Sequence, residues 1–143
     1  MIKDIMIFDL DGTLSLAGDR LKYLQRKPKD WDKFYERCGE DLPNESIVKI
    51  CQVLYYSYKV MILTGRKESV RSITEKWLDD NEIPYCELLM RPDYDYREDS
   101  IVKPELLGHF GERVIAIFED RDRMVTRWRE LGYTCLQVQK GDY

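Results

Sequence analysis

The stretch Ile5-Met6-Ile7-Phe8-Asp9-Leu10-Asp11-Gly12-Thr13-Leu14 decides the fold that we predict for this chain. Its apolar, strand-forming start predicts a strand buried on both faces, as in a parallel sheet. Asp9 and Asp11 follow that strand directly, at the edge where open α/β sheets bind their ligands. Two carboxylates this close repel one another unless a cation lies nearby, so the pair indicates Mg²⁺. Gly12 would let the backbone approach a phosphate closely.

The two acids suit different steps of a phosphoryl transfer. Asp9 would attack phosphorus to form an aspartyl-phosphate and would also bind the metal. Asp11 would protonate the leaving oxygen and then activate the water that hydrolyses the intermediate. The alternative is an ordinary strand-to-loop turn, in which Asp and Gly are common.

Length and composition limit the class of protein. The 143 residues, 43% apolar and 35% charged, fit a single domain over 1–143 with one core. We expect a cytoplasmic protein without a membrane partner, because the chain has neither a signal-peptide pattern nor a run of ~18–20 apolar residues. The formal net charge of −4 argues against a protein that coats nucleic acid, but not against one that binds only a terminus.

The cysteines and the single histidine exclude other chemistries. Four widely spaced cysteines are expected as reduced thiols, several of them in the core. Because His109 is the one histidine, the sequence argues against a zinc site and against a Ser-His-Asp mechanism.

Alternating strand and helix patterns predict the rest of the fold. Beyond the opening strand, we expect strands over 59–63, 85–90, 113–118 and 134–138, and helices over 44–58, 69–81, 100–107 and 123–131. We expect Asn44 and Gly132 to cap helices, and Pro104 to lie near the first turn of one. The pattern indicates an α/β protein: a three-layer, Rossmann-like fold with a five-stranded, mainly parallel sheet.

Residues 15–43 form a short insertion in this pattern, too short for a large cap. A helix is expected to start near Asp30, its N-cap. A basic run from Arg20 to Lys29 is interleaved with Tyr23 and followed by Trp31. This run could hold a nucleotide by phosphate pairing and base stacking, or it could be a solvated surface.

Polar residues follow two later strands at their carboxyl ends. Thr64 could donate to a phosphoryl oxygen, Gly65 permits close approach, and Arg66 offers a fork that suits phosphate. Lys103 could be a fixed positive charge in the same site, oriented by Asp99 four residues earlier, or simply a surface lysine.

Glu119-Asp120-Arg121-Asp122 follows the strand 113–118. Acids from two separate strands would provide hard oxygen ligands for one Mg²⁺. Which of Glu119, Asp120 and Asp122 contacts the metal stays open, with Asp120 favoured.

These motifs carry a family resemblance. Asp9-Leu10-Asp11-Gly12-Thr13, Thr64-Gly65-Arg66, Lys103 and Glu119-Asp120 resemble the four-motif set of the haloacid dehalogenase-like phosphohydrolases. More narrowly, the chain resembles the 3′-phosphatase domain of phage-type polynucleotide kinase-phosphatases over nearly its whole length. The run from Trp128 to Val138, with the ending Gly141-Asp142-Tyr143, is especially specific.

The resemblance implies a role for each matching residue. Asp9 would be the nucleophile, and Asp11 the general acid/base with its backbone carbonyl on Mg²⁺. Thr64 and Lys103 would bind the phosphoryl group, and Asp120 would complete the metal site.

It also implies supporting residues. Arg20, Arg66 and Asp99 would assist phosphate binding or orient the site. Glu119, behind the metal ligands, stands where the phage enzymes usually have Asp.

The sequence therefore predicts a Mg²⁺-dependent 3′-phosphatase that acts on DNA or RNA ends or on nucleoside 3′-monophosphates. Without a kinase half, only the phosphatase reaction is expected. A general nucleotidase or small-molecule phosphatase is the alternative. A non-catalytic interaction module supporting a separate kinase or ligase is a third. The choice between DNA and RNA, the length of strand and the oligomeric state stay open.

Overall fold

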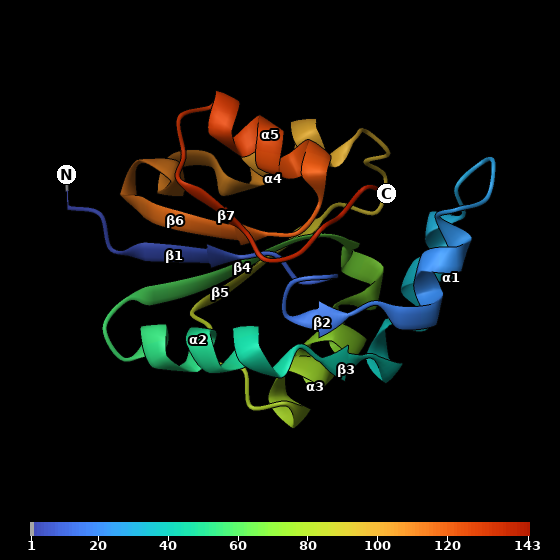
Figure 1. Cartoon of the computed structure of the whole chain (residues 1–143), viewed down its shortest axis with the longest axis horizontal. Helices are drawn as coiled ribbons and strands as arrows, with labels where there is room; N and C mark the ends of the chain where they lie inside the picture. The colour runs from blue at the N-terminus through green and yellow to red at the C-terminus, as the bar shows by residue number, and fades with distance from the viewer. Residues whose placement is uncertain (1) are drawn as a thin grey trace.

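The structure, a computed structural model, describes residues 2–143. Its centre is a five-stranded sheet with the strand order β5-β4-β1-β6-β7 (Figure 1). The strands are β1 (Ile5–Phe8), β4 (Lys59–Lys67), β5 (Glu87–Arg91), β6 (Val114–Glu119) and β7 (Cys135–Gln137). Every neighbouring pair is parallel, so the sheet predicted as mainly parallel is parallel throughout.

Helices cover both faces of this sheet, which confirms the three-layer prediction (Figure 1). One pair covers one face and a second pair covers the other. The first pair is α2 (Glu45–Tyr55) and α3 (Arg71–Asp80), and the second is α4 (Asp99–Leu107) and α5 (Asp122–Glu130). Two short 3₁₀ turns, η3 (Glu68–Val70) and η4 (Gly108–Arg113), precede α3 and β6.

The strands are apolar on both sides because alternate side chains point to opposite faces of a sheet. Along β1, Met6 and Phe8 belong to the core that α2 and α3 cover, and Ile5 and Ile7 belong to the core that α4 and α5 cover. The continuous apolar run that opens the chain is therefore divided between two cores.

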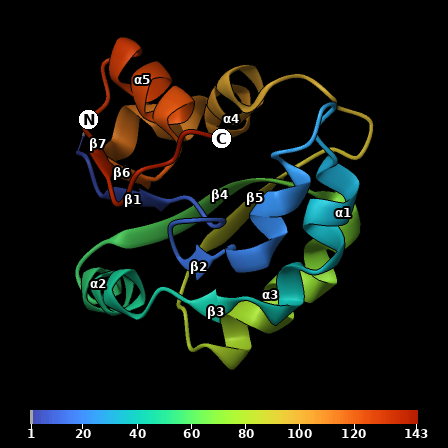
Figure 2. The ribbon, with the colours of Figure 1, turned by 45° about the vertical axis from the view of Figure 1, so that its right-hand side comes forward.

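Residues 15–43, predicted as an insertion, form a small unit beside the sheet (Figure 2). Its elements are β2 (Ser15–Leu16), η1 (Gly18–Tyr23), α1 (Trp31–Glu36), η2 (Cys38–Glu40) and β3 (Leu42–Pro43). The two strands pair antiparallel and close the insertion at its base. A third apolar cluster fills it, consisting of Ala17, Leu24, Phe34 and Tyr35.

One helix differs locally from the prediction. Pro104 lies inside α4 rather than in its first turn, because the helix begins at Asp99. Proline has no N–H to donate to the carbonyl of Ser100, four residues earlier. The Arg127 guanidinium donates to that carbonyl instead, with an Nε–O distance of 3.2 Å.

Two of the three predicted caps, Asp30 and Gly132, are formed, and the side-chain cap predicted at Asn44 is not. Asp30 accepts a hydrogen bond from the backbone N–H of Lys33, and Gly132 follows α5 with a φ of +91°. Asn44 is the N-cap residue of α2, but its side chain donates to the carbonyl of Thr13, at 3.0 Å. Asn44 therefore ties the helix to the loop after β1 instead of capping it.

The cysteines are free thiols, as expected. Cys51 and Cys135 lie in the two cores of the sheet, Cys38 is buried within the insertion, and Cys86 is exposed. Within the described part of the chain, no helix combines the length and apolar character that a membrane span requires.

Candidate active site

Asp9 lies directly after β1, and both of its carboxylate oxygens have a donor. Lys103 Nζ donates to Oδ1 at 2.7 Å, and Thr13 Oγ1 donates to Oδ2 at 3.0 Å. All three side chains are buried. Thr13 belongs to the opening motif, but its residue type alone did not reveal that it holds Asp9.

Lys103 joins Asp9 to a second carboxylate. Its Nζ also donates to Glu119 Oε2 at 3.0 Å. Burial alone would lower the pKa of this amine, but the negative charges of Asp9 and Glu119 outweigh it and raise the pKa well above its usual value. Lys103 is therefore a permanent positive charge beside Asp9.

Three carboxylates gather at this point, from the ends of β1 and β6. Asp9, Glu119 and Asp120 each offer an oxygen within 4.8 Å of the others. Burial and the charge of Asp9 raise the pKa of Asp120 to about 8, and the same two causes raise that of Glu119. Lys103 brings one positive charge to these three carboxylates, so the cluster is stable in its fully ionised form only with a further cation among its oxygens.

The oxygens of Asp120 fit a metal ion. Its Oδ1 is buried and has no hydrogen-bond partner among residues 2–143. Gly12, with a φ of +83°, lies so close that a Cβ there would collide with the Asp120 carboxylate. Glu119 has both oxygens engaged, one by Lys103 and one by the backbone N–H of Asp120, at 3.2 Å. Asp120 is therefore the better direct ligand.

The backbone carbonyl of Asp11 faces the same point. The hydroxyl of Tyr143 donates to Asp120 Oδ2 at 2.8 Å and lies 3.3 Å from that carbonyl oxygen. The hydroxyl oxygen of Tyr143 thus contacts both the Asp120 carboxylate and the Asp11 carbonyl, the two groups that the resemblance assigned to the metal. Asp122 lies outside the cluster and accepts a hydrogen bond from Gln137 instead.

The side chain of Asp11 pairs with two arginines. Arg66 donates to both of its oxygens, at 3.0 and 2.8 Å, and Arg20 donates to Oδ1 at 2.6 Å. Burial alone would raise the pKa of Asp11, but the charges of Arg66 and Arg20 outweigh it and hold the pKa well below its usual range. Asp11 is therefore ionised in this arrangement.

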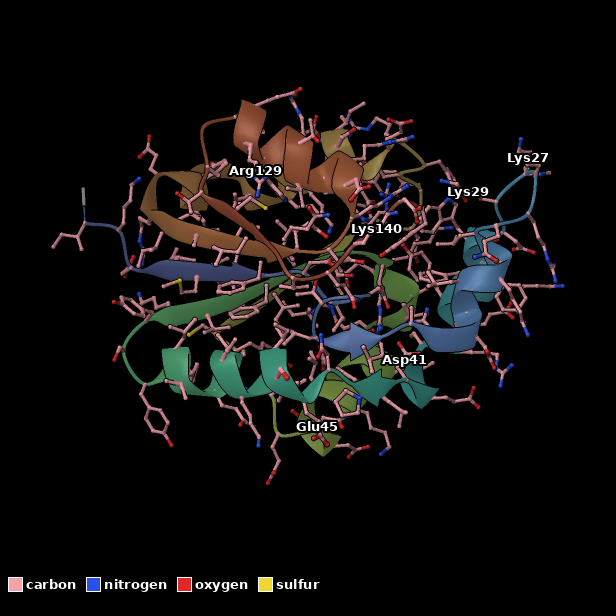
Figure 3. The ribbon with its side chains drawn as sticks, in the orientation of Figure 1. Lys27, Lys29, Asp41, Glu45, Arg129 and Lys140 are labelled. Atoms are coloured by element: carbon pink, nitrogen blue, oxygen red, sulfur yellow. The ribbon has the colours of Figure 1, made fainter. Side chains whose placement is uncertain are left out.

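Asp41 completes a buried network of two acids and two arginines. Arg20 Nε donates to Asp41 Oδ1 at 2.7 Å, and its NH2 group also donates to Asp41. Arg66 lies 3.8 Å from the same carboxylate. Arg20 and Arg66 thus both pair with carboxylates. The resemblance implied that they assist phosphate binding or orient the site, and this arrangement suits the second role. Asp41, which follows η2 in the insertion (Figure 3), was not predicted as a site residue.

The second motif lies within β4, which runs on to Lys67 instead of ending at Leu63. Thr64 is buried at the site, where its hydroxyl accepts from the backbone N–H of Arg66 at 3.1 Å. A Cβ on Gly65 would come within 2.5 Å of the Asp99 carboxylate, so only glycine fits.

Asp99, expected to orient Lys103, pairs instead with Arg91. Its other oxygen lies 3.7 Å from Arg121. Neither arginine was singled out from the sequence. Arg121 does follow Asp120 directly, so its place after β6 was the available signal.

The site is a small hollow of about 20 Å³ at the carboxyl edge of the sheet. Its lining includes most of the predicted residues, namely Asp9, Asp11, Thr64, Gly65, Asp99, Lys103 and Glu119. Strands β4, β1 and β6 are neighbours, which brings motifs far apart in the sequence to one place.

This fold is shared with haloacid dehalogenase-like hydrolases. A hydrolase of that family from Streptococcus pneumoniae superposes with a TM-score of 0.63 at 15% identity, covering 94% of this chain and 84% of its own. A likeness at that identity establishes the fold alone.

The chain belongs to the polynucleotide kinase phosphatase domain family, whose model matches residues 3–143. A chain of the Pnkp1/Rnl/Hen1 complex is 35% identical, with a TM-score of 0.85 over 99% of this chain and 48% of that one. A second structure, of the Pnkp1/Rnl/Hen1 RNA repair complex, gives 0.83 at the same identity, over 99% and 44%.

A curated relative comes from Autographa californica nuclear polyhedrosis virus. It is designated a bifunctional polynucleotide kinase/RNA ligase and is 28% identical over 132 residues, which are 88% of this chain and 18% of the viral protein. The chain thus spans about half the length of the repair-complex chains and under a fifth of the viral protein.

Proposed function

We propose that this chain is a Mg²⁺-dependent phosphomonoesterase that removes 3′-phosphates from polynucleotide ends or nucleoside 3′-monophosphates. The observation that carries the proposal is Asp9, which is held between Lys103 and Thr13 and lies beside Asp120 with its free Oδ1. A nucleophilic carboxylate needs this kind of positive surrounding, because the phosphate that it attacks is itself negative.

In the first step a carboxylate oxygen of Asp9 forms a bond to phosphorus, and the bond from phosphorus to the 3′-oxygen breaks. Lys103 offsets the charge of Asp9 and of the phosphoryl oxygens, and Thr64 lies close enough to donate to one of them. Mg²⁺, held by Asp9, Asp120 and the carbonyl of Asp11, would supply further positive charge to those oxygens.

In the second step a water oxygen forms a bond to phosphorus, the bond from phosphorus to Asp9 breaks, and Asp11 accepts the proton of the water, so that inorganic phosphate leaves and the Asp9 carboxylate is restored. The ionised state of Asp11 suits this step. To protonate the leaving 3′-oxygen in the first step, the carboxylate must turn from Arg20 and Arg66 toward the site and carry a proton. The general-acid role thus needs a side-chain position different from the one observed.

The relatives support a role in the repair of nucleic-acid ends. Two of them come from structures of Pnkp1/Rnl/Hen1 complexes, and one is designated a kinase/ligase. We propose that this chain likewise acts beside a separate kinase or ligase, on ends that carry a 3′-phosphate.

The test is phosphate release from matched oligonucleotides phosphorylated at the 3′ or the 5′ end, with Mg²⁺ and with EDTA. Release from the 3′ end alone, abolished by EDTA and by Asp9→Asn, is expected. Equal release from both ends would instead favour a general nucleotidase. No Mg²⁺-dependent release from any phosphomonoester would favour a non-catalytic module.

A further inference from the structure

Two aromatic side chains of α1 line the small hollow that contains Asp9. Trp31 and Tyr35 lie four residues apart on this helix, and therefore on the same face of it. The helix belongs to the insertion, beyond the carboxyl edge of the sheet from which Asp9 comes (Figure 1). Asp9 thus bounds the hollow from the side of the sheet, and Tyr35 bounds it from the side of the insertion.

The hydroxyl of Tyr35 is free for a ligand. The residue is only 8% exposed. Burial and then the charges of Asp99 and Asp11 raise its pKa well above the usual value, so the hydroxyl keeps its proton. Both of these carboxylates pair with arginines instead, and within residues 2–143 the hydroxyl forms no hydrogen bond. A hydroxyl that is buried without a partner costs free energy, so its place at the hollow indicates that a ligand accepts its hydrogen bond.

Packing holds the ring of Tyr35 in place. It stacks on Trp31 with the ring centroids 5.8 Å apart, and it meets the edge of Phe34 with the centroids 5.3 Å apart. The backbone carbonyl of Phe34 accepts a hydrogen bond from Arg20, whose guanidinium also pairs with Asp11. The arginine that holds the expected general acid therefore also holds the helix that carries Tyr35.

The course of phosphoryl transfer indicates which substrate atom Tyr35 meets. The hollow has about 20 Å³, whereas a single water needs roughly 10–15 Å³, so a phosphoryl group in it contacts every wall. The attacking and leaving oxygens lie roughly in line, on opposite sides of phosphorus. Because Asp9 attacks from the side of the sheet, the 3′-oxygen leaves on the side of Tyr35. Lys103 and Thr64 serve the phosphoryl oxygens, whereas Asp11, paired with arginines, offers nothing to the leaving oxygen in the observed arrangement.

We propose that the hydroxyl of Tyr35 donates a hydrogen bond to the leaving 3′-oxygen, which makes Tyr35 a further catalytic residue. The inference rests on the proposed phosphatase function. As the bond from phosphorus to the 3′-oxygen breaks, negative charge develops on that oxygen, and the hydroxyl stabilises it. Tyr35 keeps its own proton. The proton that the 3′-oxygen gains comes from Asp11, once that carboxyl group has turned toward the site.

The test exchanges the leaving atom. An oligonucleotide with a 3′-phosphate is compared with the same oligonucleotide carrying a bridging sulfur in place of the 3′-oxygen. A thiolate leaves readily, and sulfur accepts hydrogen bonds only weakly. Tyr35→Phe should lower kcat/KM about 100-fold on the oxygen substrate, the effect of removing one donor to a developing oxyanion. On the sulfur substrate its kcat/KM should be nearly unchanged.

The two substrates also reveal a different contact. An equal loss of kcat/KM on both would mean that the hydroxyl serves a phosphoryl oxygen or the shape of the site, and would overturn the assignment to the leaving oxygen. No loss on either substrate would overturn it as well.

Tyr133→Phe is the matched control. Tyr133 is a partly buried tyrosine whose ring packs on Trp128 and whose hydroxyl lies beside Gly111, before β6 and thus at the opposite edge of the sheet. This control should leave kcat/KM on both substrates at its original value. A shift in the control equal to that of Tyr35→Phe would contradict a specific role for Tyr35.

Stability and the unmodified protein complete the test. Tyr35→Phe keeps the packed ring and breaks no bond within the described residues, so its Tm should match the original. A marked fall in Tm would mean that the hydroxyl is bonded within the protein, and would overturn the inference. If the original protein hydrolyses neither substrate, the phosphatase proposal fails and the inference fails with it. If the original protein hydrolyses the oxygen substrate and Tyr35→Phe does so equally well, only the inference fails.

Discussion

Asp41 allows the buried charge network beside the site to be tested by single substitutions. It shares Arg20 with Asp11, and Arg66 lies between the same two acids. The network holds two positive and two negative formal charges, on side chains that are at most 11% exposed. Asp41→Leu leaves both arginines with one acid, and Arg20→Met leaves both acids with one arginine.

Each single substitution should cost about 3–5 kcal/mol of unfolding free energy, because it leaves one buried charge uncompensated. This is a large part of the ~5–15 kcal/mol that stabilises a typical domain. With a urea m value of about 2 kcal/mol/M, the unfolding midpoint should fall by about 2 M. The double substitution leaves Asp11 and Arg66 as a balanced pair, so it should cost much less than the sum of the two.

The assay is urea unfolding of the two single variants and the double variant, followed by far-UV circular dichroism. Asp19→Asn is the control, because Asp19 is an exposed acid of the same insertion without an ion pair in the described residues. Its free energy of unfolding should stay within about 0.5 kcal/mol of the original. If the costs of Asp41→Leu and Arg20→Met simply add in the double variant, the network does not balance charge as we describe.

Three further predictions concern the metal site and the thiols. Tyr143→Phe removes the hydroxyl that holds Asp120, so Mg²⁺ should bind about tenfold more weakly, measured as a smaller Mg²⁺-induced rise in Tm; an unchanged rise would contradict this role. In EDTA, Tm should fall as pH increases from about 4 to about 8. Folding raises the pKa of Asp120 from 3.8 to about 8, so between these pH values the folded protein binds the Asp120 proton more tightly than the unfolded chain does. Mg²⁺ should remove that fall, whereas a fall of equal size with Mg²⁺ would mean that Asp120 does not hold the ion. A thiol reagent should label Cys86 alone in the folded protein, because burial raises the pKa of Cys51 and of Cys135 to about 12; mass spectrometry showing a second label would contradict the buried positions.

Much of the fold could be predicted because its cause is local in the sequence. The run Ile5–Phe8 is apolar at every position, which indicates a strand with a core on both sides, and the structure has both cores. That Asp9 and Asp120 lie close together could be predicted from the sequence, because the carboxyl ends of parallel strands share one edge of the sheet. The structure places both in one acidic cluster.

Other parts of the site could not be predicted, because they depend on partners distant in the sequence. Arg66 was predicted as a fork that suits phosphate and Arg20 as part of a basic run, yet both pair with Asp11, and Arg20 pairs with Asp41 as well. Residue type reveals that a guanidinium needs an anion, but only the packing of the insertion on the sheet decides which anion it meets.

Tyr143 shows the same limit in another way. It belongs to the ending Gly141-Asp142-Tyr143 that carries the family resemblance, but that run did not indicate what the tyrosine does. Its hydroxyl reaches Asp120 only because the segment after β7 returns across the site (Figure 1). The pattern of helices and strands determines which sheet edge holds the site. Contacts such as that between Tyr143 and Asp120 depend instead on how the loops fold.

Transfer of the phosphoryl group to Asp9 is the central claim, and rapid acid quench tests it most directly. Enzyme in excess is mixed with an oligonucleotide carrying a labelled 3′-phosphate, and the label on the protein is followed in time and located by mass spectrometry of the peptide that contains Asp9. We expect the label to appear on Asp9 before free phosphate is released, and Asp9→Asn to show neither. Release of phosphate at full rate with no label on the protein at any time would mean that water attacks directly, and would contradict the role given to Asp9.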